Sequence, residues 1–127
     1  MKLSRTSTYA IQAMVHVAQQ DGSIVIGHKA AAELKVPEGF LLRILVALSR
    51  NRLLNSIKGP NGGYHLARPA KDITLLDIME AADGPVVSSS QNGTLAGPLG
   101  KKLDKIFSEA TQHQRTTFQK VKLSQLV

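Results

Sequence analysis

Apolar and polar residues follow the period of an amphipathic α-helix in several stretches of this chain. Over residues 5–20 the apolar side chains recur on one face, at Tyr9, Ala10, Ala13, Met14, Val17 and Ala18. An alanine-rich stretch over residues 28–35 predicts a second helix, which Pro37 ends because proline cannot continue a helical turn. Residues 38–50 predict a third helix with a core stripe at Phe40, Leu41, Ile44, Leu45 and Leu48.

Two short runs with the composition of strands, residues 53–57 and 64–67, follow the third helix. The connection between them consists of Gly59, Pro60, Asn61, Gly62 and Gly63, and Tyr64 begins the second run. Pro60 fixes φ, whereas the three residues after it tolerate positive φ, so the segment predicts the tip of a β-hairpin. Upstream, residues 24–26 predict either a very short strand or an extended lead-in.

The second half of the chain predicts one short and one long helix. Thr74 and Asp77 have the spacing of a capping box, and the buried face behind them is predicted at Leu75, Ile78, Met79 and Ala82. Gly84 and Pro85 end the short helix, and residues 84–98, rich in Gly, Ser and Pro, form a loop. A long helix is predicted from Leu99 to about Val121, with an apolar stripe at Leu99, Leu103, Ile106, Phe107, Ala110, Phe118 and Val121.

A helix of this length leaves its own domain with too little surface to cover the stripe. The stripe therefore predicts a homodimer interface. The alternative is that the helix packs back on its own domain. These elements divide the chain into a domain at residues 1–83, a loop at 84–98, and a dimerisation helix with a C-terminal segment at 99–127.

The first 70 residues combine helix, turn, helix and hairpin, which is the order of a winged helix-turn-helix domain. The predicted fold is mainly α with a small β-hairpin. The formal net charge is +7, and residues 1–70 contain nine Lys or Arg but only three Asp or Glu. Because the excess positive charge lies on the predicted winged domain, it favours double-stranded DNA as the partner.

The outward face of the third helix gives the candidate base-reading residues Gly39, Leu42, Arg43 and Val46. Arg43 has the geometry to bind guanine O6 and N7 together. Leu42 and Val46 either contact thymine methyl groups or are buried against another element. Candidate DNA-backbone contacts are Lys2, Lys29, Ser49, Arg50, Arg52 and Lys58, and the wing is formed by Gly59, Pro60, Asn61, Gly62, Gly63 and Tyr64.

The sequence gives little support for disulfides, metal sites or catalysis. The chain has no cysteine, which excludes disulfides, thiolate metal sites and a cysteine nucleophile. The four histidines are scattered, and the pair Glu109 and His113 has the spacing of a simple surface pair. Without a nucleophile motif or phosphate loop, we expect no enzyme, no metal and no cofactor. No apolar run reaches membrane-spanning length and no signal peptide begins the chain, so a cytoplasmic location is expected.

Nearly the whole chain resembles the Rrf-two family of bacterial winged-helix regulators, which includes IscR, NsrR and CymR. The resemblance rests on the N-terminal motif of residues 1–4 with Tyr9-Ala10, on the hairpin motif of residues 58–64, and on residues 66–68 and 73–77. The closing residues 122–127 also resemble the last short element of the family. The resemblance implies a homodimer crossed by the long helix, which binds a palindromic operator and usually represses transcription.

Three departures from the family pattern alter what is expected. Cluster-binding members have three cysteines in the loop before the long helix, where this chain has Ser88, Ser89, Ser90 and Gln91. Lys35 stands in the helix-turn-helix turn, which usually has Gly, so a strained or different turn is expected. Leu42 and Val46 replace polar residues of the recognition helix. We therefore expect a regulator without an iron–sulfur cluster.

Three interpretations remain open. The first is a dimeric DNA-binding repressor, with a small-molecule effector as one possible source of control. The second is a regulator controlled by a partner protein such as a cysteine-biosynthesis enzyme, which the resemblance to cysteine-free relatives suggests. The third is a winged-helix interaction module with weak or no DNA binding. Lys29, Arg43, Arg50 and Lys58 favour DNA binding, whereas Lys35, Leu42 and Val46 favour the module.

Overall fold

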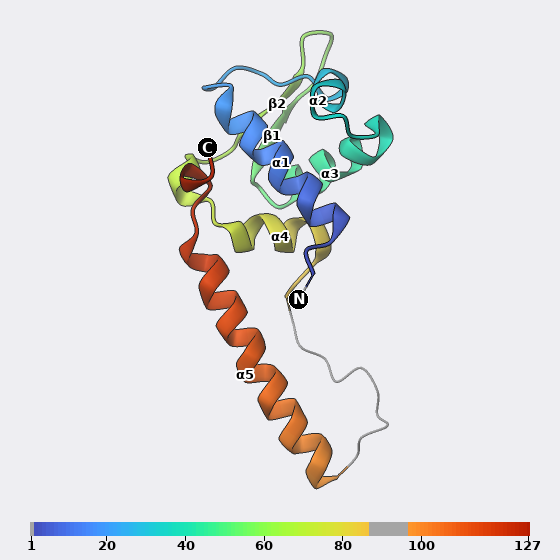
Figure 1. Ribbon diagram of the computed structural model, residues 1–127. Coiled ribbons are helices and arrows are strands. Elements are labelled where there is room, and N and C mark those ends of the chain that lie inside the picture. The colour runs from blue at the N-terminus through green and yellow to red at the C-terminus, as the bar shows by residue number, and fades with distance from the viewer. Residues whose placement is uncertain (1, 87–96) are drawn as a thin grey trace.

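Three helices, a β-hairpin and two further helices follow one another in the computed structural model, which describes residues 2–86 and 97–127 (Figure 1). The helices are α1 (Arg5–Gln19), α2 (Gly27–Leu34), α3 (Glu38–Arg50), α4 (Leu75–Asp83) and α5 (Pro98–Lys120). The strands β1 (Leu54–Ile57) and β2 (Gly63–Leu66) pair antiparallel, and η1 (Ala70–Asp72) and η2 (Leu123–Gln125) are 3₁₀ turns. The prediction of a mainly α chain with a small hairpin is confirmed.

Helix α1 forms the centre of the fold, in contact with α2, α3, α4 and the hairpin. Its apolar face buries Ala10 and Met14 completely, and small side chains such as Ala10 allow the neighbouring helices to approach closely. The predicted stripe of α3 is buried at Leu41, Ile44, Leu45 and Leu48. Phe40, predicted in the same stripe, is only half-buried and lies at the edge of the core.

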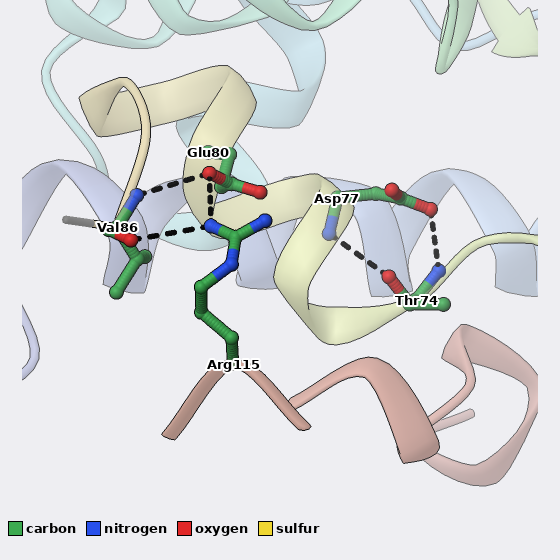
Figure 2. A network of polar contacts seen from close by, with 5 residues as sticks. All are labelled: Thr74, Asp77, Glu80, Val86 and Arg115. Carbon is green, nitrogen blue, oxygen red and sulfur yellow. Dashed lines mark hydrogen bonds and ion pairs between the residues drawn. The ribbon is translucent and has the colours of Figure 1, made fainter. Parts of the chain in front are cut away.

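Helix α4 begins with the predicted capping box. The Thr74 hydroxyl accepts from the Asp77 N–H and the Asp77 carboxylate accepts from the Thr74 N–H, both at 3.0 Å (Figure 2). Its predicted buried face is wrong in part. Leu76, Ile78 and Ala81 are buried, whereas Leu75, Met79 and Ala82 are half-buried. The reason is that α4 contacts α1, α3 and α5, so more than one side of this short helix is covered.

Helix α5 extends away from the packed helices, and only its C-terminal end lies beside them (Figure 1). Both of its ends lie within one residue of the prediction. After Lys120 the chain returns to the domain. The Leu75 N–H donates to the Val121 carbonyl and the Leu123 N–H donates to the Ile73 carbonyl, each at 2.8 Å. Leu123 is fully buried, so the C-terminal segment is part of the winged domain's core.

Candidate nucleic-acid interface

The turn between α2 and α3 depends on a lysine with left-handed backbone geometry. Lys35 has φ 56° and ψ 43°, and its neighbour Val36 donates its N–H to the Ala31 carbonyl at 3.0 Å. This bond closes the end of α2 in the manner for which glycine is usually required. The expected strain at Lys35 is therefore present, and left-handed geometry costs a non-glycine residue roughly 1–2 kcal/mol.

The outward face of α3 presents the predicted base-reading residues to solvent. Gly39, Arg43 and Val46 are exposed, together with Arg50 on the same side. Val46 is 40% exposed and Leu42 is 36% exposed, so neither is buried in the single chain. Leu42 nevertheless packs against α2 at Gly27. A Cβ placed on Gly27 would lie 2.7 Å from the Cδ2 atom of Leu42. Gly27 thus lets the two helices of the helix-turn-helix approach closely.

Arg43 rests on an aromatic pair that the sequence analysis did not identify. Its guanidinium carbon lies 5.7 Å from the centroid of the Phe40 ring, and Phe40 in turn meets Tyr9 of α1 edge-on, with centroids 5.4 Å apart. An exposed cation–π contact contributes about 0.5–1 kcal/mol, so it orients Arg43 without preventing its release to a base. The i, i+3 spacing of Phe40 and Arg43 is the signal that predicts such a contact.

In the hairpin, Gly62 and Gly63 are required by close backbone contacts and not by positive φ angles. Within the hairpin only Gly59 has positive φ, at 107°, so the tip does not use the tolerance of Asn61, Gly62 and Gly63 for positive φ. A Cβ on Gly62 would lie 2.0 Å from the Ile57 carbonyl oxygen. The glycine is needed there because the two strands close tightly across the tip.

Gly63 has a corresponding role at the start of β2, next to the hairpin tip. A Cβ at this position would lie 2.4 Å from the Val25 carbonyl oxygen. Val25 and Tyr64 exchange backbone hydrogen bonds of 2.7 and 2.8 Å and form an isolated β-bridge, so of the two alternatives for residues 24–26 the structure has an extended lead-in paired at one residue. The lead-in to α2 therefore supports β2 from the side and fixes the wing relative to the helix-turn-helix.

The candidate backbone-contacting cations are free of ion pairs within the described part of the chain. Lys2, Lys29, Arg50, Arg52 and Lys58 are all exposed, and none of them contacts a carboxylate there. Arg52 has left-handed geometry with φ 61°. Figure 1 shows α2, α3 and the hairpin gathered at one end of the molecule, so four of the five cations come from neighbouring elements.

Two predicted backbone contacts are placed less favourably. Ser49 is half-buried, and its hydroxyl donates to the Leu45 carbonyl at 2.9 Å, so a phosphate would have to replace this bond. Lys2 lies at the other end of α1, two residues before Ser4, whose hydroxyl donates to Asp83 at the end of α4. Lys29, Arg50, Arg52 and Lys58 therefore lie on or between α2, α3 and the hairpin, whereas Lys2 precedes the N-terminal end of α1.

The predicted stripe of α5 is exposed along most of its length. Leu99, Ile106 and Phe107 are 58%, 58% and 54% exposed, and Ala110 is also exposed. The half-buried members of the stripe are Leu103, Phe118 and Val121. None of the described helices is long and apolar enough to cross a membrane.

Comparison with known proteins agrees with this geometry. The sequence model of the Rrf2 family, described as an iron-dependent transcriptional regulator, matches residues 3–127. A helix-turn-helix transcriptional regulator of Mycobacterium tuberculosis is 39% identical over 89 residues, which cover 69% of this chain and 55% of that protein. IscR of Cereibacter sphaeroides is 28% identical over an alignment that covers 100% of this chain and 87% of the relative.

Two solved structures have the same fold as this chain. CymR of Bacillus subtilis, a global cysteine regulator, superposes with a TM-score of 0.79 at 22% identity, over 99% of this chain and 95% of that one. CymR of Staphylococcus aureus has a TM-score of 0.71 at 25% identity, over 97% and 95% of the two chains. The winged-helix prediction is confirmed. The chain belongs to the Rrf2 family, whose members are transcriptional regulators rather than enzymes, and it spans about half the length of its Mycobacterium relative.

The side chains do not fit the iron that the family description names. The chain has no cysteine, so it offers no thiolate for an iron–sulfur cluster. Among residues 2–86 and 97–127, no three His, Asp or Glu side chains gather closely enough to hold a metal ion. Ser88, Ser89, Ser90 and Gln91, which stand where the resemblance predicts cluster ligands, lie outside the described residues.

Proposed function

We propose that this chain is a sequence-specific DNA-binding repressor that acts as a homodimer on a palindromic operator in the cytoplasm. In this proposal α3 enters the major groove, with Arg43 reading guanine and Gly39, Leu42 and Val46 facing the neighbouring bases. The hairpin lies against the adjacent backbone. Lys29, Arg50, Arg52 and Lys58 contact phosphates and set the register of the protein on the duplex.

The observation that supports this proposal best is the composition of the surface around α3. Four exposed cations besides Arg43 come from α2, α3, the α3–β1 turn and the wing, and none of them is paired with a carboxylate in the described residues. Unpaired cations on neighbouring elements fit a polyanion, because each gains a phosphate partner without giving up an internal one. A merely solvated surface has no reason to concentrate them at one end of the molecule.

Selection of bound duplexes from a random pool tests the proposal. We expect a palindrome to emerge, and its affinity to fall with salt at a slope near −5 if about six phosphates are contacted per dimer. A single half-site should bind far more weakly than the palindrome. Operator placed across a promoter should then reduce transcription in a purified system. Failure to select any sequence at low salt would overturn the proposal.

A second candidate is an interaction module or a regulator controlled by a partner protein. The observation that favours it is the exposure of Leu42 and Val46 on the recognition face, since apolar side chains form no hydrogen bonds to bases. We propose that the control of DNA binding comes from a small-molecule effector or from an enzyme of metabolism, in place of a cluster. Binding of operator by Leu42→Ser and Val46→Ser variants separates the candidates. If these residues face bases, the substitutions should change operator affinity, whereas in an interaction module operator binding is weak or absent already in the parent and should not respond to them.

A further inference from the structure

Arg115 of α5 contacts both α4 and the segment that follows α4 (Figure 2). Its guanidinium lies 2.8 Å from Oε2 of Glu80 in α4 and 3.2 Å from the carbonyl oxygen of Val86, and it donates to both. The same Glu80 oxygen accepts from the Val86 N–H at 3.0 Å. We call Glu80, Val86 and Arg115 the α4–α5 clamp.

The clamp is partly shielded from water. The side chains of Arg115 and Glu80 are only 30% and 25% exposed. Charge-assisted hydrogen bonds in such surroundings are stronger and less screened than those of exposed ion pairs. The clamp thus holds α5 against α4 at a point where the remainder of the helix has left the domain.

Helix α5 has a second fixed point at its end. The Val121 carbonyl accepts from the Leu75 N–H, and the following segment is anchored by Leu123 in the core. Val121, the C-cap of α5, follows Arg115 by six positions, which is about 9 Å at the usual helical rise. Two fixed points on a rigid helix define its direction, so Val121 acts as the pivot and Arg115 sets the angle.

The exposed apolar stripe of α5 lies farther from Val121 than Arg115 does. Ile106, in the middle of the stripe, is about 22 Å from Val121 at the usual helical rise. A shift of about 1 Å at the clamp therefore moves the stripe by about 2.5 Å relative to the winged domain, or about 5 Å between two symmetric protomers. This exceeds the rise of one base pair, about 3.4 Å.

We infer that Arg115 is a positioning residue that sets the spacing of operator half-sites by fixing the angle between α5 and the winged domain through Glu80 and Val86. The inference rests on the proposed function, because half-site spacing has meaning only for a dimer joined through α5. Arg115 lies on α5 and not on the recognition surface of α3 and the hairpin. Its effect is therefore on the distance between the two recognition helices and not on the sequence within a half-site.

The angle is measured without DNA by spin labels. The chain has no cysteine, so Asn55→Cys in β1 and Lys101→Cys in α5 provide the only two labelling sites, and both positions are exposed. Labelled protein is mixed with excess unlabelled protein so that pulsed dipolar spectroscopy records the distance within one chain. We expect one narrow distribution for the parent and a broader or displaced one for Arg115→Gln and for Glu80→Gln.

Two control variants show whether a changed distance comes from loss of the clamp and not from loss of a charge or from misfolding. Arg115→Lys keeps a cation opposite Glu80 and should retain a narrow distribution. Lys105→Gln removes an exposed cation from the same helix, where it has no carboxylate partner in the described residues, and should match the parent. Because Arg115→Gln and Glu80→Gln remove the same ion pair from opposite sides, agreement between them identifies the clamp even if one variant folds poorly.

The second measurement is binding to palindromes whose central spacer differs by single base pairs. The parent should prefer one spacer, and Arg115→Gln should reduce that preference roughly fivefold while leaving affinity for a single half-site unchanged. Unchanged distances in Arg115→Gln overturn the inference. Changed distances with an unchanged spacer profile overturn the role in spacing. If the parent selects no DNA at all, the proposed function and the spacing role both fail, while the distances still decide whether the clamp sets the angle.

Discussion

The hydroxyl of Ser7 donates to the carboxylate of Asp83 at 2.5 Å and so joins the beginning of α1 to the end of α4. Ser7 is the one buried polar residue among those described, at 1% exposure. Ser4, the N-cap of α1, donates to the same carboxylate oxygen. Asp83 is thus the shared acceptor for two hydroxyls at the start of the helix that forms the centre of the core.

Removing this acceptor should destabilise the domain. Asp83→Ala leaves the buried Ser7 hydroxyl without a partner, which costs about 1–3 kcal/mol in the free energy of unfolding. Asp104→Ala, at an exposed position of α5, should change it by less than about 0.5 kcal/mol. Urea unfolding followed by circular dichroism measures both. Equal stability of the Asp83 and Asp104 variants would show that water replaces the lost acceptor.

Removing the left-handed strain at Lys35 should instead raise the free energy of unfolding. Lys35→Gly removes the strain at φ 56° and should stabilise the protein by about 0.5 kcal/mol, even though glycine also loosens the unfolded chain. Lys29→Gly places the same substitution inside α2, where it should destabilise by about 1 kcal/mol. The pair is compared by urea unfolding, and a loss of stability in both variants would contradict the turn geometry.

The helix positions could be predicted from the sequence because each depends on local signals. The period of the apolar residues defined α3 over residues 38–50, and the spacing of Thr74 and Asp77 identified the start of α4. The buried face of α4 could not be predicted in the same way, since its covering comes from α1, α3 and α5 together. Local periodicity contains no information on how many neighbours a short helix has.

In the candidate site, too, features that depend on local sequence could be predicted, and features that depend on contacts between distant segments could not. The outward face of α3 followed from helical geometry. Gly39 and Arg43 are exposed as expected, and Leu42 and Val46, for which burial was an alternative, are exposed as well. The contact between Glu80 and Arg115 joins residues 35 positions apart, and no sequence pattern relates them. In the hairpin the glycines were identified, but their role was not, because a steric conflict with Val25 depends on the packing of a distant segment.

Gly39 offers a substitution whose effects on folding and binding should differ in sign. Nothing lies within 4 Å of a Cβ placed there, and the residue is helical, so Gly39→Ala should stabilise α3 by about 0.5 kcal/mol. If the backbone approaches the bases at this position, the added methyl group should weaken operator binding. Fluorescence anisotropy with labelled operator tests this. Unchanged affinity in the stabilised variant would show that DNA does not approach Gly39.

The two kinds of DNA contact should respond differently to mutation. Arg43→Ala should relax the preference at one position of each half-site, which costs about 1–3 kcal/mol on the preferred sequence. Lys58→Ala should weaken all sequences alike and make the salt dependence shallower, because it removes a phosphate contact. Binding curves on matched and substituted operators measure both effects. An Arg43 variant with unchanged sequence preference would place the base-reading side chains elsewhere, for example on the wing.

The stripe of α5 should fail as a homodimer interface when a charge is placed on it. Ile106 is 58% exposed in the single chain, and a carboxylate at this position could not be hydrated once two stripes pack together. Ile106→Asp should therefore yield monomers in sedimentation analysis and abolish cooperative binding to the palindrome, since the two recognition helices lose their fixed spacing of about one DNA turn. Ser108→Asp places the same charge outside the apolar stripe and should remain dimeric. A parent protein that sediments as a monomer at micromolar concentration would contradict dimerisation through α5.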